Sequence, residues 1–172
     1  SSATRLDPQG AWWCVRQCAA VMAQARPTAK LLKGRAPCPE TGQVVHALQA
    51  SLPGCEVKAE ESITCRAIDD LATMLERRGC ALLQLEGKVH AADSSGVFWI
   101  WMVGTETQYG ANSRRETALL VVGQHWPAPW STGFGAKVFP HDDGRWKLCS
   151  VDGEVIQGRL TALITVKPMV AS

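Results

Sequence analysis

The spacing of hydrophobic residues changes near residue 80, and this change limits what the chain can fold into. Before residue 80, apolar residues recur at helical spacing in three segments, residues 11–25, 41–52 and 64–78. After residue 80, short apolar runs alternate with turns rich in Gly and Asp, a pattern typical of strands. Helices followed by antiparallel strands predict an α+β fold.

The apolar runs after residue 80 are short enough for single strands of a buried sheet. In the run over residues 97–103, alternation puts Trp99 and Trp101 on one face and Phe98 on the other. Because both faces are apolar, we expect this strand to be buried on both sides. The other expected strands cover residues 80–85, 118–122, 135–139, 146–149 and 163–166.

A single domain accounts for the length and charge of the chain. Its 172 residues can bury a full core, with a helical part over about 1–79 and a sheet part over about 80–168. The net charge of +2 does not favour a nucleic-acid or membrane-surface partner. No apolar run reaches the roughly 18 residues that a membrane-spanning helix needs, and no secretory leader opens the sequence.

The cysteines do not have the spacing of a metal site. Seven are present, at positions 14, 18, 38, 55, 65, 80 and 149, an odd number with irregular intervals and no Cys-x-x-Cys pair. We therefore expect neither a zinc site nor any other metal or cofactor. Cys18, Cys65 and Cys80 lie among apolar residues and are interpreted as small core side chains. Free thiols are the simplest interpretation, and one or two disulfides stay open.

One short motif points to chemistry. Gln9 and Gly10 are followed by two tryptophans and then by Cys14, near the start of an apolar helical segment. A cysteine at a helix N-terminus lies beside unpaired backbone N–H groups and the positive end of the helix dipole. Both favour the thiolate, which is the nucleophilic form. The side-chain amide of Gln9 could stabilise an oxyanion formed next to that sulfur.

This motif resembles the active-site entry of papain-like cysteine proteases, most closely the staphopain and effector-protease branch and the bacteriocin leader peptidases. The resemblance implies a papain-like α+β fold, in which N-terminal helices, with Cys14 on the central helix, pack on a C-terminal antiparallel sheet. It implies a cysteine-dependent hydrolase or transferase acting on a peptide or a glutamine amide. It also implies a secreted bacterial effector or toxin that acts in the cytoplasm of a host or target cell.

The catalytic histidine of the family is missing from its expected place. In the family it begins the strand that ends in Val-Gly, and that position holds Phe98 or Val97 here. If the strands over 97–103 and 118–122 pair antiparallel, residues 124–126 lie beside Phe98. His125 then becomes the candidate base, with Gln124 at the position of the family's orienting Asn. His90, in the loop before residue 97, is the alternative base.

Three functions remain open from the sequence. In the first, Cys14 attacks a carbonyl, Gln9 and the Cys14 backbone N–H hold the oxyanion, and His125 or His90 transfers the proton. In the second, the chain is a catalytically inactive papain-like domain that binds a peptide. In the third, it is an interaction module that binds a protein partner through the Trp- and Pro-rich loop over 126–134, with Cys14 merely buried. The substrate, the choice between hydrolysis, deamidation and acyl transfer, and the oligomeric state stay undetermined.

Overall fold

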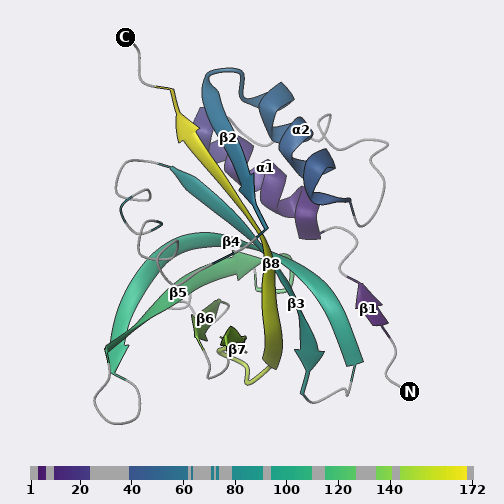
Figure 1. Ribbon diagram of the computed structural model, residues 1–172, viewed down its shortest axis with the longest axis vertical. Helices are drawn as coiled ribbons and strands as arrows, with labels where there is room; N and C mark the ends of the chain where they lie inside the picture. Colours follow the sequence, from purple (N-terminus) through teal and green to yellow (C-terminus); the bar gives the residue numbers. More distant parts are fainter. Residues whose placement is uncertain are drawn as a thin grey trace.

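The fold is dominated by strands (Figure 1). The computed structural model describes residues 4–6, 10–23, 39–61, 63, 71, 73, 79–90, 94–109, 115–126, 135–140 and 144–169. The helices are α1 (Gly10–Ala23) and α2 (Thr41–Ser51). The strands are β1 (Thr4–Leu6), β2 (Cys55–Glu60), β3 (Cys80–Val89), β4 (Ser94–Tyr109), β5 (Arg115–Gly123), β6 (Ala136–Pro140), β7 (Trp146–Ser150) and β8 (Val155–Pro168).

Both helices lie where their sequence spacing predicts them. The N-terminus of α2 is held by a capping box in which the Glu40 backbone N–H donates to Gln43 Oε1 at 2.8 Å. After Leu52, Pro53 and Gly54 prevent the helix from continuing. The segment expected as a third helix, residues 64–78, lies almost entirely outside the described residues. Among the described helices, none is long and apolar enough to cross a membrane.

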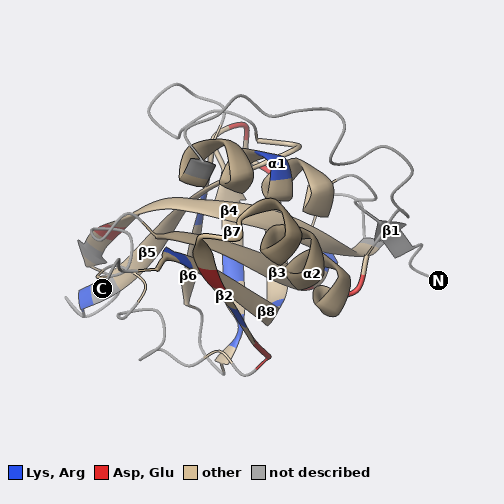
Figure 2. Ribbon diagram, turned by 90° about the horizontal axis from the view of Figure 1, so that it is seen from above, with Lys and Arg blue, Asp and Glu red and all other residues tan. Residues whose placement is uncertain are grey.

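Six strands close into an antiparallel barrel. Around the barrel the order is β4, β3, β8, β7, β6 and β5, and β5 pairs back to β4. The short strand β1 pairs parallel to the start of β4, and β2 pairs antiparallel to the C-terminal half of β8. The two helices and β2 lie together above the barrel in Figure 1, and the view from above shows α1 and α2 over the strands (Figure 2).

The expected papain-like arrangement, helices packed on a C-terminal antiparallel sheet, is therefore wrong. Helix α1 does pack on a strand that follows residue 80, mainly β4. However, the strands curl into a closed barrel, and α1 and α2 cover only part of its outer surface. The alternation of apolar residues is the same in a strand of an open sheet and in a strand of a barrel, so it could not distinguish the two.

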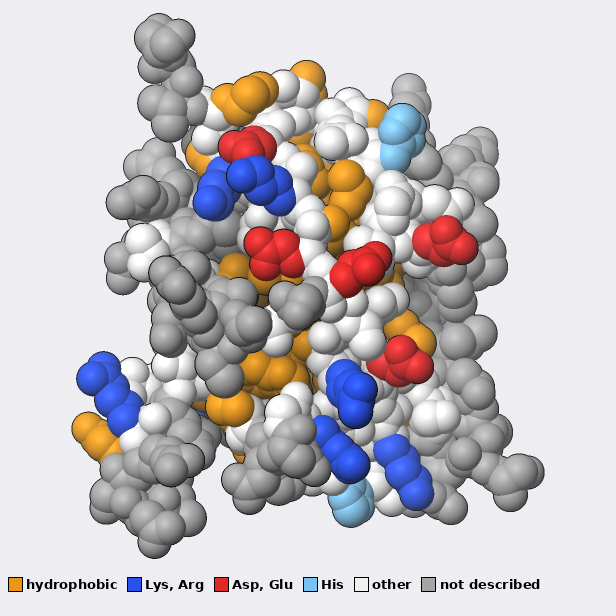
Figure 3. Space-filling view, in the orientation of Figure 1, with side chains coloured by type: hydrophobic (Ala, Val, Ile, Leu, Met, Phe, Trp, Pro, Cys, Tyr) orange, Lys and Arg blue, Asp and Glu red, His pale blue; other side chains and the backbone are white. Residues whose placement is uncertain are grey.

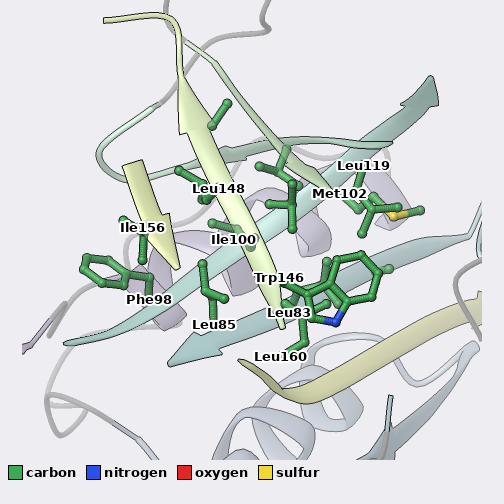
Figure 4. Packing of buried hydrophobic residues seen from close by; sticks show 14 of the residues in the cluster. Leu83, Leu85, Phe98, Ile100, Met102, Leu119, Trp146, Leu148, Ile156 and Leu160 are labelled. Carbon is green, nitrogen blue, oxygen red and sulfur yellow. The ribbon is translucent and has the colours of Figure 1, made fainter. Parts of the chain in front are cut away.

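The apolar residues divide into two clusters separated by the barrel wall. Inward-facing side chains fill the barrel and form the barrel core, which includes Leu83, Leu85, Phe98, Ile100, Met102, Leu119, Trp146, Leu148, Ile156 and Leu160 (Figure 4). Outward-facing side chains of the same strands, including Leu82, Trp99 and Ile164, pack under the helices and form the helix-side core. The expected strand over residues 97–103 is thus buried on both faces in its middle, where Phe98, Trp99, Ile100 and Met102 lie, whereas Val103 at its end is exposed.

Two glycines allow β3 and β8 to approach closely at the lower end of the barrel. Gly87 and Gly158 are paired directly across the two strands. A Cβ on Gly158 would overlap the Glu86 carbonyl oxygen and the Gly87 Cα, and one on Gly87 would overlap the Gln157 backbone. Irregularities in register at Gln84/Leu85 and at Met102/Gly104 bend the long strands further. These features let flat strands curve into a closed wall.

The strand β2 was not expected from the sequence. Its alternation of Glu56, Lys58 and Glu60 with Cys55, Val57 and Ala59 is a strand pattern, but the second set of side chains is small or weakly apolar. Val57 and Cys55 rest against the helix-side core, so pairing with β8 and contact with α2 stabilise this segment. Tertiary contacts therefore decide its structure.

Candidate functional site

The structure brings His125 next to Phe98, as the sequence predicts. Strands β4 and β5 pair antiparallel, with Ile100 opposite Gly123, so the residues after β5 lie beside the start of β4. The chain then turns tightly, because Gly123 and Trp126 exchange two backbone hydrogen bonds of 3.0 Å each. This turn fixes Gln124 and His125 at the surface, where both are exposed.

Three aromatic rings meet at this turn. The His125 ring lies edge-on to Phe98, with ring centroids 6.3 Å apart, and edge-on to Trp126 at 5.8 Å. Phe98 and Trp126 are buried in the barrel core, with centroids 6.3 Å apart. The Trp126 indole N–H is buried, and the structure gives it no hydrogen-bond partner among the residues it describes. The rest of the Trp- and Pro-rich loop, residues 127–134, lies outside the described residues.

Cys14 lies on the other side of the barrel wall from this turn. It is fully buried in the helix-side core, together with Trp99, whereas Phe98 belongs to the barrel core. Helix α1 begins at Gly10, so Cys14 is the fifth helical residue and not at the N-terminus, where the motif places it. Its backbone N–H therefore falls within the helical hydrogen-bonding register and is not one of the unpaired donors of the first turn. Gln9 lies outside the described residues.

His90 lies away from Cys14 in the fold. His90 is exposed in the turn after β3, where its backbone N–H donates to the Val155 carbonyl at 2.9 Å. Strand β3 begins at Cys80, a cysteine of the helix-side core, and the turn with His90 follows the other end of this strand. His46 is exposed on α2, and His141 lies outside the described residues.

Four cysteines gather around the helix-side core. Cys14, Cys18 and Cys80 are buried, Cys55 is half-buried, and none of the four forms a disulfide. The Cys18 thiol donates a hydrogen bond to Cys80, and this bond lowers the pKa of Cys80. The pKa of Cys18 is raised, because the same hydrogen bond and burial both favour its protonated form. Within the described part of the chain, no group of three or more His, Cys, Asp or Glu residues could hold a metal ion. Buried thiols in apolar surroundings are chemically inert.

A second feature, which the sequence reading missed, is a cluster of basic side chains on the outer surface of the barrel. Lys88 on β3 is paired with Gln157 on β8, and Gln157 is paired with Lys147 on β7. Arg159 lies two residues along β8 on the same side, opposite Glu86. We call Lys88, Gln157, Lys147 and Arg159 the basic face; Figure 3 shows basic side chains gathered over the lower ends of β3 and β8. Lys88 is far in sequence from the other three residues, which lie on β7 and β8, so strand pairing is needed to reveal the cluster.

Comparisons with known proteins do not add to this geometry. No protein-family model, no curated protein and no solved structure matches the chain. Two features of the molecule itself bear on its function. These are the separation of Cys14 from the His125 turn and the basic face on the barrel.

Proposed function

We propose that the chain is a non-enzymatic binding module for a protein partner. The observation that carries the proposal is the placement of Cys14. Its sulfur is buried under α1 on one side of the barrel wall, while His125 contacts Phe98, a residue of the other side. Nucleophilic catalysis by cysteine requires the thiol and its base within hydrogen-bond reach of each other and of a substrate. A thiol enclosed by the helix-side core does not meet the second requirement.

The basic face supports the choice of an acidic protein segment as the partner. Lys147 and Arg159 project from neighbouring strands of a rigid barrel, and Gln157 lies between Lys88 and Lys147. The sheet fixes the spacing of the backbone positions from which these side chains extend. A row of carboxylates on an extended peptide would meet complementary charge along this row. Gln157 could add hydrogen bonds to the backbone of such a peptide.

We expect Cys14 to react slowly with iodoacetamide. Alkylation needs a solvent-exposed thiolate, and Cys14 has no exposed surface, whereas Cys55 and Cys149 are half-buried. Cys14 should be labelled at least about tenfold more slowly than Cys149, because it reacts only when the structure opens locally. Brief alkylation of the native protein, followed by mass-spectrometric peptide mapping, measures the two rates.

The same experiment can contradict the proposal. Rapid labelling of Cys14, lost in His125→Ala but kept in the control variant His46→Ala, would mean that His125 activates this thiol. His46 is an exposed histidine on α2 and has no role in either function. That outcome would replace the binding module with a cysteine-dependent hydrolase or transferase.

We expect the barrel to bind an oligoglutamate peptide through the basic face. Lys147→Glu combined with Arg159→Glu should weaken this binding by about tenfold or more, since two attractive charges become repulsive. Added salt should weaken the wild-type complex as well, because Lys88 and Arg159 are exposed and Lys147 is only half-buried. Fluorescence anisotropy of a fluorescein-labelled peptide measures both effects.

The control for this experiment is Lys167→Glu. Lys167 is an exposed lysine on the same strand as Arg159, but it lies at the opposite end of β8, opposite Glu56 on β2. It should leave the affinity nearly unchanged. Equal weakening by Lys167→Glu would mean that net charge alone drives binding, and tighter binding of an oligouridylate would favour a nucleic acid over an acidic protein.

A further inference from the structure

The strand β2 presents an unpaired edge. It lies beside the upper half of β8 in Figure 1 and pairs with β8 from Cys55 to Glu60. Among the described residues, no strand pairs with its other edge. Unpaired edges are templates for the addition of another strand.

The register shows which backbone groups face this edge. Met169 donates a 3.0 Å hydrogen bond to the Gly54 carbonyl, which makes these two residues a hydrogen-bonded pair of the ladder. Because such pairs alternate in antiparallel sheets, Glu56, Lys58 and Glu60 direct their backbone groups toward β8. The N–H and C=O groups of the alternate residues, including Val57 and Ala59, therefore point to the unpaired edge. The Cys55 N–H also points away from β8 and bonds the Leu52 carbonyl at 3.0 Å.

The side chains of β2 carry alternating charge. Glu56, Lys58 and Glu60 occupy one face, and a 3.0 Å ion pair joins Lys58 Nζ to Glu56 Oε1. Both side chains remain largely exposed, at 66% for Lys58 and 50% for Glu56. Charged side chains, especially lysines, often protect an edge from pairing, and charges of one sign would repel a second copy. With the order negative, positive, negative, opposite charges face each other only when a second, antiparallel copy is offset, for example so that Glu56 lies opposite Lys58.

We propose that two copies of the chain associate through antiparallel pairing of their β2 strands, with the two-fold axis at Val57. In this register, Val57 of each copy exchanges both backbone hydrogen bonds with Val57 of the other, and the Ala59 N–H meets the Cys55 carbonyl. Glu56 of each copy lies opposite Lys58 of the other, so two ion pairs form by symmetry. A pairing shifted to an axis at Lys58 would place Glu56 opposite Glu60 and Lys58 opposite Lys58, which is repulsive.

The test is a charge reversal followed by a charge swap. Sedimentation velocity of the full chain over a wide range of concentrations should show a monomer–dimer equilibrium. Glu56→Lys and Lys58→Glu should each weaken the dimer by about tenfold, because each change turns two attractive cross-strand pairs into repulsive ones. The double variant Glu56→Lys/Lys58→Glu restores opposite charges at every pair and should recover the wild-type dimer.

The matched control is Glu60→Lys. Glu60 lies on the same face of β2 but opposite Gly54 in the proposed register, so this reversal should leave the dimer intact. A chain that stays monomeric at the highest concentration overturns the proposal. So does a dimer that survives both single reversals, or one that Glu60→Lys dissociates as strongly as Lys58→Glu does. Circular dichroism of each variant verifies that the exposed substitutions leave the fold unchanged.

Discussion

Gly158→Ala should destabilise the protein by about 3 kcal/mol or more, because the barrel has no room for a methyl group at this position. The added Cβ would overlap the backbone of Glu86 and Gly87 on the neighbouring strand. Backbone atoms cannot move aside as a flexible side chain can, so β3 and β8 would have to separate at this point. The free energy of unfolding from urea denaturation, followed by circular dichroism, measures the effect.

The matched control is Gly104→Ala on β4. Its nearest neighbour would be Leu120 Cδ1 at 3.5 Å, an ordinary van der Waals contact. This change should alter the free energy of unfolding by less than about 1 kcal/mol. If Gly158→Ala proved equally mild, the close approach of β3 and β8 would not be what holds the barrel closed.

Phe98→His should destabilise the protein without activating Cys14. Phe98 is almost fully buried in the barrel core, so replacing it with an imidazole removes apolar contacts and buries a polar ring. We expect a loss of about 2–4 kcal/mol in the free energy of unfolding. Because Cys14 lies in the helix-side core, the new histidine would not face its sulfur. Alkylation of Cys14 in the folded variant should therefore stay as slow as in the wild type.

Tyr109→His is the control for this substitution. Tyr109 is an aromatic residue of the same strand, but 75% of its surface is exposed. Its replacement should change stability by less than about 0.5 kcal/mol. A rise in Cys14 alkylation in Phe98→His, absent in Tyr109→His, would show that position 98 reaches the thiol and would revive the catalytic hypothesis.

Part of the candidate site followed from local pattern alone. Period-2 alternation separated Phe98 from Trp99 and Trp101, and the structure places them in two different cores as predicted. Antiparallel pairing of neighbouring strands predicted that His125 lies beside Phe98, and the ring contact confirms it. These predictions succeeded because they depend only on strand geometry and on elements that are adjacent in the chain.

The position of Cys14 could not be obtained in this way. The motif around it predicted a helix start with the thiol at its N-terminus. The helix begins at Gly10, one residue before the expected start at residue 11, so Cys14 is its fifth residue and lies in the same buried core as Trp99. The spacing of apolar residues predicted the helix itself, whereas its packing against β4 is a tertiary contact.

The sequence by itself determined where the chain forms α1, α2 and most of its strands, because these depend on the local spacing of apolar residues. Only the tertiary structure decided that the strands close into a barrel. Closure joins β3 to β8 and β5 to β4, and the first pairing links residues more than sixty positions apart. Barrel closure depends on three features acting together: strand twist, the register shifts, and the contact between Gly87 and Gly158. Such non-local geometry leaves no periodic signal in the sequence, so the barrel, the basic face and the burial of Cys14 emerge only in three dimensions.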